Sequence, residues 1–143
     1  MINLDTHMLV FALVGRLRPR ERELMETESW GISDIVFWEI AKLVELGRLR
    51  LDFADRTVRR TLASLHVWPI DMEIAEKSTQ LDFDGDPADQ LIAATSVVHG
   101  VALLTRDRRI RRSRLVPLAL GSARRAASRR PSRRKRRVVA RKR

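Results

Sequence analysis

Cysteine is absent from the 143-residue sequence. Its absence excludes a disulfide framework, a thiolate metal site and a cysteine nucleophile. A chain without disulfides fits a reducing compartment, and we expect the protein in the cytoplasm. Long hydrophobic runs are lacking as well, because the longest near the N-terminus, residues 8–14, falls far short of the roughly 20 residues that span a bilayer. We therefore expect no membrane association.

Acidic residues are missing from residues 121–143, which also lack aromatic side chains. Twelve of the 29 Lys and Arg residues lie in this segment, which leaves 17 basic residues against all 18 acids in residues 1–120 and a net charge of −1 there. A segment with so little to bury does not offset its ordering entropy, so we expect a disordered basic tail. The overall charge of +11 thus belongs to the tail and does not make residues 1–120 a basic nucleic-acid-binding domain.

Short apolar runs alternate with helical patterns in residues 1–120, which is the length of one domain. Ser33 or Asp34 is the expected N-cap of the third helix, and Asp86 followed by Pro87 starts the last one. Strands separated by helices predict an α/β fold with a mostly parallel sheet covered on both faces. We expect strands at residues 1–5, 30–33, 67–71, 101–105 and 115–120, and helices at residues 8–14, 18–29, 33–47, 55–65, 72–81 and 87–99.

Three aspartates become neighbours in such a fold. Asp5 ends the first strand, and Asp107 lies just past the strand at 101–105. If these strands are parallel neighbours, both acids emerge at the carboxyl edge of the sheet, where ligands bind in open α/β folds. The helix at 87–99 runs antiparallel to the strand that follows it, so its first turn brings Asp89 to the same edge. Each acid alone is better explained as a helix cap or loop residue, whereas the convergence of all three is harder to explain in this way.

Glu39 is a fourth candidate, because the positions four and three residues before it and four and seven after it are apolar. A carboxylate in the middle of an apolar helical stripe is costly to bury unless something compensates its charge. A local pair with Lys42, or a side chain that reaches out at the edge of the stripe, explains this position as well as a bound cation does.

Carboxylates gathered at one point repel one another and raise one another's pKa unless a cation neutralises them. Oxygen ligands without cysteine favour Mg²⁺ or Mn²⁺ over zinc. Such a cation polarises a phosphoryl oxygen and lowers the pKa of a bound water for attack on a phosphodiester. From the residues alone, an acidic metal site and simple helix capping both remain open for this edge of the sheet.

Three motifs in order resemble the PIN-domain family, and most of all its VapC-type ribonuclease toxins of bacterial toxin–antitoxin pairs: LDTH at 4–7, SDIVFWEIAKLVELGRL at 33–49 and DPADQLIAATSVVHGVALLTRD at 86–107. The resemblance covers essentially all of residues 1–120. It implies a PIN-like three-layer α/β/α sandwich with a central, mostly parallel sheet, and an endoribonuclease that depends on Mg²⁺ or Mn²⁺. It also implies an RNA substrate, a homodimer and a small antitoxin protein that inserts near the active site.

Position by position, the catalytic acids of the family fall on Asp5, Glu39, Asp89 and Asp107. The resemblance implies Asp5, Asp89 and Asp107 as the metal ligands. Thr105 matches a hydroxyl residue that often accompanies the last acid, and Asp86 matches a frequently acidic position, which we interpret as a helix cap with a supporting role.

The arginines around Asp107 and the basic tail offer contacts to RNA. Arg106, Arg108 and Arg109 either bind RNA phosphates or belong to a solvated charged helix. The tail either adds salt-dependent affinity for nucleic acid or has no role. An alternative function is therefore a catalytically inactive PIN-like nucleic-acid-binding or regulatory protein that acts through its tail. Phosphotransfer by an aspartyl nucleophile is weaker, because a dehalogenase-type phosphatase has a second aspartate where this sequence has His7.

Overall fold

Four strands and seven helices alternate along residues 1–121, the part of the chain that the computed structural model describes. Apart from Gly121, the expected basic tail at 121–143 lies outside these residues. The strands are β1 (Ile2–Leu4), β2 (Trp30–Ser33), β3 (His66–Trp68) and β4 (Leu103–Leu104). The helices are α1 (Thr6–Leu13), α2 (Pro19–Thr27), α3 (Ile35–Glu45), α4 (Arg56–Ser64), α5 (Met72–Ser78), α6 (Pro87–His99) and α7 (Arg108–Arg112).

The strands form one parallel sheet in the order β3-β2-β1-β4. Asn3 pairs with Gly31 on one side and with Leu103 on the other, so β1 lies inside the sheet. Because all pairs are parallel, the carboxyl ends of the four strands meet at one edge. The predicted α/β class with a central parallel sheet is confirmed.

The last two expected strands are shorter than the sequence predicts. Strand β4 has only Leu103 and Leu104, and the run at 115–120 contributes a single parallel bridge between Leu103 and Leu118. Leu103 donates its N–H to the Pro117 carbonyl at 2.7 Å and accepts the Ala119 N–H at 2.9 Å. Pro117 has no N–H to donate, which is a physical reason why the pairing does not extend.

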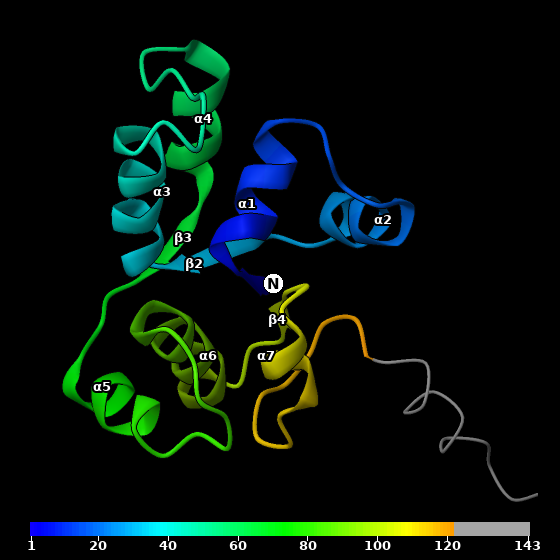
Figure 1. The fold of residues 1–143 in the computed structure, drawn as a ribbon. Coiled ribbons are helices and arrows are strands. Elements are labelled where there is room, and N and C mark those ends of the chain that lie inside the picture. The colour runs from blue at the N-terminus through cyan, green and yellow to red at the C-terminus, as the bar shows by residue number, and fades with distance from the viewer. Residues whose placement is uncertain (122–143) are drawn as a thin grey trace, which may run out of the picture.

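Helices cover both faces of the sheet. In Figure 1, α1, α3 and α4 lie on one side of the strands, and α5 and α6 lie on the other. Strand β1 is entirely buried between these layers. Fully buried core side chains come from β1, α1 and α6, among them Leu4, Met8, Leu9 and Ile92. This is the three-layer sandwich that the sequence predicts.

Two aspartates near helix starts behave differently. Asp86 accepts the Ala88 N–H at 2.9 Å, and with Pro87 it begins α6 as predicted. Asp34 directly precedes α3, but its side chain does not cap that helix. Its Oδ2 accepts the N–H of Ile70 at 3.3 Å instead, and its backbone N–H donates to the Trp68 carbonyl at 3.0 Å. Asp34 therefore joins the start of α3 to the chain that leaves β3.

Gly31 allows close packing between β2 and a tryptophan of β3. A Cβ atom at this position would lie 2.4 Å from Cζ3 of Trp68. Trp68 is buried and stacks on the ring of His99 with a centroid separation of 5.6 Å. The absence of a side chain at Gly31 thus lets Trp68 connect the sheet to the end of α6.

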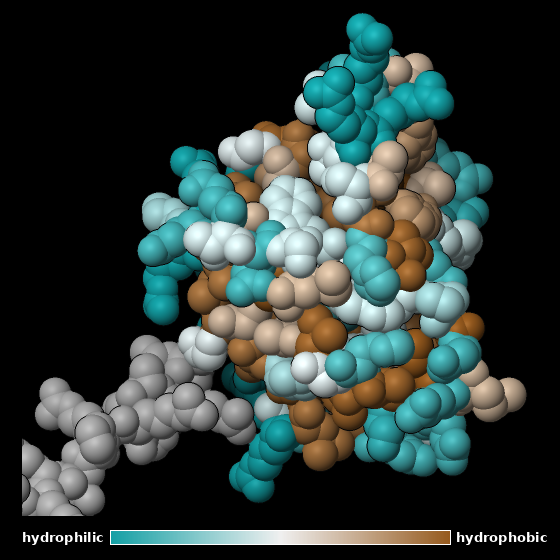
Figure 2. Space-filling model, turned by 180° about the vertical axis from the view of Figure 1, so that it is seen from behind, coloured by the Kyte–Doolittle hydropathy of each residue, from teal (hydrophilic) through white to brown (hydrophobic). Residues whose placement is uncertain are grey.

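Polar and charged residues cover much of the surface, with apolar areas between them, as the view from behind shows (Figure 2). Three large apolar side chains of α3 and its end, Phe37, Trp38 and Leu46, are exposed. Among the helices of residues 1–121, none reaches the length and hydropathy that a bilayer crossing requires.

Candidate active site

The predicted acids meet at the carboxyl edge of the sheet. Asp5 follows β1 directly, and its backbone N–H donates to the carbonyl of Leu104 at the end of β4 at 3.1 Å. Asp107 comes three residues after β4, while Glu39 and Asp89 come from α3 and α6, which contact each other. Four segments that are distant in the sequence are therefore brought to one point.

Asp5 is the most deeply buried of these acids, with only 4% of the residue exposed. Its Oδ2 accepts a hydrogen bond from the Thr105 hydroxyl at 2.7 Å. Its Oδ1 is also buried and has no hydrogen-bond partner among the described residues. Burial raises the pKa of Asp5, and the bond from Thr105 opposes this effect only in part. A buried carboxylate oxygen without a partner requires compensation that residues 1–121 do not supply.

Thr105 connects two of the acids. Its hydroxyl donates to Asp5, and the same oxygen accepts the backbone N–H of Asp107 at 3.0 Å. This arrangement fixes the donor direction of the hydroxyl, since its lone pair is used by Asp107. Thr105 thus links the Asp5 carboxylate to the backbone of Asp107, and its supporting role stays a prediction.

Glu39 is linked to the residue that follows Asp5. The hydroxyl of Thr6, the residue after Asp5, donates a hydrogen bond to Glu39 Oε2. Lys42, the alternative local partner, bonds to Glu45 at 2.6 Å instead. Burial is the largest cause that raises the pKa of Glu39, and repulsion from Asp5 and Asp86 adds to it. The local ion pair that would explain this residue without a function is therefore not formed.

Asp89 also has a raised pKa. Burial is the largest cause, and repulsion from the four neighbouring acids adds to it, so that its pKa rises to about 6. Repulsion from four carboxylates shows that the negative charges act on one small volume. Among residues 1–121, one cation contacts this carboxylate directly: Arg109 Nη2 lies 3.3 Å from Asp89 Oδ2.

Asp107 has both a structural and an electrostatic role. Its Oδ1 caps the short helix α7 by accepting the N–H groups of Arg109 at 2.7 Å and Ile110 at 3.2 Å. Its Oδ2 lies 3.3 Å from Arg109 Nη2, the same nitrogen that contacts Asp89. Although burial alone raises the pKa of Asp107, the bonds from Arg109 and the backbone outweigh it and keep this pKa below its ordinary value. Arg109 is therefore the protein's own cation between two of the acids.

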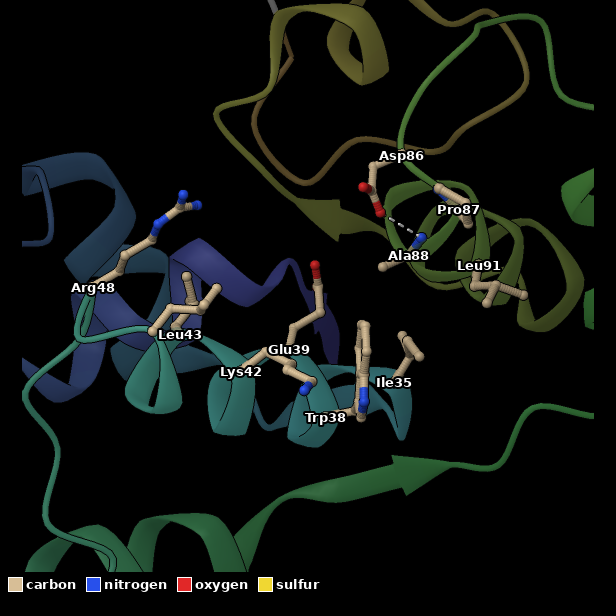
Figure 3. A pocket seen from close by; sticks show the side chains of 11 residues that line it. Ile35, Trp38, Glu39, Lys42, Leu43, Arg48, Asp86, Pro87, Ala88 and Leu91 are labelled. Atoms are coloured by element: carbon tan, nitrogen blue, oxygen red, sulfur yellow. Dashed lines mark hydrogen bonds between the residues drawn. The ribbon is translucent and has the colours of Figure 1, made fainter.

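A pocket of 690 Å³ opens beside these acids. Glu39 and Asp86 line it together with apolar side chains of α3 and α6, including Trp38 and Leu91. Figure 3 shows the carboxylates of Glu39 and Asp86 turned toward the same open space, with Asp86 also bonded to the N–H of Ala88. Of the four predicted acids, Glu39 lines this pocket, whereas Asp5, Asp89 and Asp107 do not.

Arg106 does not face this pocket. Its Nε and Nη2 bind Glu21 of α2 at 2.8 and 2.6 Å, and Nη2 also donates to the Arg16 carbonyl at 3.1 Å. Its guanidinium lies 4.0 Å from the ring centroid of Phe11. RNA contact by Arg106 was one of two alternatives that the sequence left open. In the structure its guanidinium pairs with Glu21 and joins the chain after β4 to α2. Arg108 is exposed on α7.

The sequence did not reveal Thr6 or Glu21 as part of this region. Thr6 lies in the LDTH motif beside Asp5, so its position in the chain was an available signal. Glu21 lies in a charged helix and is separated from Arg106 by 85 residues, and no local pattern indicates their pairing.

The donor chemistry of the site fits a hard divalent cation. All four predicted acids supply oxygen, Asp5 Oδ1 is buried without a partner, and Asp89 is raised in pKa by its neighbours. Within residues 1–121, no three acidic or histidine side chains already form a ligand set around one point. Arg109 instead neutralises part of the charge.

A parallel α/β fold with an acid cluster at the carboxyl edge of its sheet defines the class of protein. The sequence matches the PIN domain over residues 2–114, and the chain belongs to the PIN-domain family. Among its relatives is Ribonuclease VapC22 of Mycobacterium tuberculosis, which is 32% identical over 118 residues that cover 78% of this chain and 90% of that protein. The predicted likeness to VapC proteins is confirmed.

Three solved structures share the fold. A toxin–antitoxin complex from Klebsiella pneumoniae gives a TM-score of 0.57 at 22% identity, over 75% of this chain and 87% of that one. VapBC2 from Rickettsia felis, bound to a DNA fragment from its promoter, gives a TM-score of 0.60 at 18% identity, over 82% of this chain and 97% of that one. FitAcB from Neisseria gonorrhoeae gives a TM-score of 0.60 at 23% identity, over 77% of this chain and 90% of that one.

Proposed function

We propose that this protein is the ribonuclease toxin of a toxin–antitoxin pair and that it hydrolyses RNA phosphodiester bonds with Mg²⁺ or Mn²⁺. The observation that carries the proposal is the convergence of four separate acids around a buried carboxylate oxygen of Asp5 that has no partner in residues 1–121. The family and the 32% identity to Ribonuclease VapC22 support the RNA substrate.

Asp5, Asp89 and Asp107 would hold the cation in this proposal. When bound, the cation supplies a Lewis acid that polarises the phosphoryl group and favours ionisation of the attacking water. Thr105 holds Asp5 Oδ2 and fixes the direction of this carboxylate. Thr6 holds Oε2 of Glu39 in the same way, so that Oε1 of Glu39 is available to accept the proton that the attacking water loses.

Cleavage of RNA by the purified full-length chain, with and without Mg²⁺, tests this proposal. Asp5→Asn keeps the size of the side chain and should reduce Mg²⁺-dependent cleavage to background, because the buried oxygen loses its charge. Asp84→Asn, in the exposed loop before α6, is the matched control and should cleave like the wild type. Undiminished cleavage by Asp5→Asn would contradict the proposal.

Binding of the cation has its own readout. Mn²⁺ titrated into the wild-type chain and followed by electron paramagnetic resonance should show binding that is lost in Asp5→Asn and kept in Asp84→Asn. This measurement separates a failure of metal binding from a failure of RNA recognition.

The partner proposed for this chain is a small antitoxin protein, because a toxin–antitoxin complex and VapBC2 are among the structures with this fold. Expression of the chain alone should arrest growth, and co-expression of its cognate antitoxin, sought among small proteins encoded next to its gene, should relieve the arrest. A homodimer stays a prediction, which light scattering of the purified chain tests. The cytoplasmic location likewise stays a prediction.

The second candidate function, nucleic-acid binding without catalysis, rests on the basic tail. Deletion of residues 121–143 would then abolish RNA binding, while Asp5→Asn would leave the effect of expression on growth unchanged. The acid cluster favours the nuclease, because a protein that only binds nucleic acid gains nothing from four repelling carboxylates.

A further inference from the structure

We call the pocket that Glu39 and Asp86 line the acid-lined pocket. A second pocket adjoins it and is lined by basic side chains. It has a volume of 560 Å³ and lies between α1 and the segment that follows α3. Its polar side chains are His7, Arg16, Arg48 and Arg50, and its apolar wall comes from α1 and the residues around Leu49. We call it the basic pocket.

The three arginines of the basic pocket have no acidic partner in the described residues. No carboxylate oxygen of residues 1–121 lies within 4.0 Å of the guanidinium groups of Arg16, Arg48 or Arg50. Residues 122–143 contain no Asp or Glu that could pair with them. All three residues are exposed. Their positive charge is therefore available to an anion, in contrast to Arg106 and Arg109, which are paired with acids.

The two pockets share a wall. Leu43 and Arg48 line both of them, and the acid-lined pocket continues from Arg48 to Glu39 and Asp86. In Figure 3, Arg48 and Glu39 extend to the same side of the chain, toward the acid-lined pocket. The two pockets therefore adjoin at Leu43 and Arg48.

The juxtaposition of opposite charges suits a polyanion that is cut at one phosphate. The acid cluster by itself repels the phosphates on either side of the cleaved bond, and a neighbouring positive surface offsets this repulsion. The mixed lining of guanidinium groups and apolar side chains also matches a nucleotide, which has a charged phosphate and a less polar sugar and base. An acidic segment of a protein partner is the competing ligand, and the binding measurements below distinguish the two.

We propose that the basic pocket binds a backbone phosphate of the RNA next to the bond that is cleaved, with Arg48 and Arg50 as its main ligands. This inference rests on the proposed ribonuclease function for the position of the cleaved bond. Arg48 lies at the boundary of the two pockets and so sets the distance between the bound phosphate and the acids.

The first test measures RNA binding as a function of salt in the full chain carrying Asp5→Asn, so that the RNA stays intact. Arg48→Gln combined with Arg50→Gln should weaken binding of a single-stranded RNA and reduce the slope of log K against log salt by about 0.7, the contribution of one neutralised phosphate of a single strand. Arg48→Lys combined with Arg50→Lys should keep most of the slope. Arg20→Gln combined with Arg22→Gln removes the same charge from the exposed surface of α2 and is the matched control.

The second test identifies the phosphate. RNAs in which one phosphate at a time is replaced by an uncharged methylphosphonate are bound to the Asp5→Asn chain with and without the two Gln substitutions. One replacement next to the cleavage site should weaken binding to the parent chain and have no further effect when Arg48 and Arg50 are Gln. Independent, additive effects at every position would overturn the proposal, because no single phosphate would then depend on these arginines.

The outcomes also separate this inference from the proposed function. A wild-type chain that does not cleave RNA refutes the nuclease proposal, whereas the salt dependence still decides whether the basic pocket binds RNA. A slope that matches that of the α2 control variant refutes the inference even if cleavage is normal. Unchanged RNA binding combined with weaker binding of an acidic protein partner also refutes it and assigns the pocket to that partner.

Discussion

Replacement of Glu21 by Gln tests the anchor between α2 and the strand end that carries Thr105 and Asp107. Glu21 accepts two bonds from Arg106, at 2.8 and 2.6 Å, and its side chain is 6% exposed. It also accepts the backbone N–H of Arg18 at 2.7 Å. Gln keeps one oxygen for these donors but removes the charge that faces the guanidinium of Arg106.

The loss of stability that we expect for Glu21→Gln follows from the burial of this ion pair. Removing one partner of a fully buried ion pair costs about 3–5 kcal/mol, because the other charge is left without compensation. The Arg106 side chain retains 23% exposure, so water replaces part of the lost interaction. We therefore expect Glu21→Gln to lower the free energy of unfolding by about 2–3 kcal/mol, below the fully buried case.

Urea denaturation of the full chain, followed by tryptophan fluorescence, measures this loss. Glu23→Gln is the matched control, because Glu23 is exposed on the same helix and forms no ion pair in the described residues. We expect Glu23→Gln to change stability by less than about 0.5 kcal/mol. Equal stabilities of the two variants would refute the reasoning.

The same pair predicts a pH dependence with a definite sign. The bond from Arg106 is the largest cause that lowers the pKa of Glu21 in the folded protein. The stabilisation is therefore complete above the ordinary glutamate pKa of about 4.3 and is lost as the pH falls through the lower pKa of the folded state. The difference between the wild type and Glu21→Gln should shrink in acid, and a difference that grows there would contradict the assignment.

Three further predictions concern the site and the sheet. Thr105→Val removes a hydrogen bond that lowers the pKa of Asp5, so the pH at which cleavage reaches half its maximum should rise, while an unchanged pH profile would contradict this coupling. Gly31→Ala should destabilise the fold by about 1–3 kcal/mol and shift tryptophan emission, because its Cβ meets Trp68 at 2.4 Å. The pKa of Asp89 is raised to about 6, so this side chain keeps its proton up to about that pH in the folded protein. Without metal, the free energy of unfolding should therefore fall by up to about 3 kcal/mol as the pH rises from about 4 to 6. Thermal unfolding should therefore show a larger stabilisation by Mg²⁺ at pH 7.5 than at pH 5, and equal shifts at both pH values would argue against Asp89 as a ligand.

Much of the fold and the meeting of the acids could be predicted from local patterns. The order of apolar runs and helical periods predicts a parallel sheet, and parallel strands end at a common edge. Asp5 and Asp107 therefore had to be neighbours once their strands paired, and the cap formed by Asp86 and Pro87 sets the place of Asp89. The catalytic and metal-binding roles of these acids stay predictions that the mutants above test.

Local patterns were insufficient where a residue's partner comes from another layer. Arg106, Arg108 and Arg109 read alike in the sequence, yet Arg106 pairs with Glu21, Arg109 lies between Asp89 and Asp107, and Arg108 is exposed. The basic pocket was hidden for the same reason, because its arginines come from two separate segments. The sequence by itself determined the class of the fold and the edge of the sheet at which the acids lie. Both depend on short-range periodicity and on where the strands end. Only the tertiary structure decided which charges are paired and which are free, because that depends on side-chain packing between elements that are far apart in the chain.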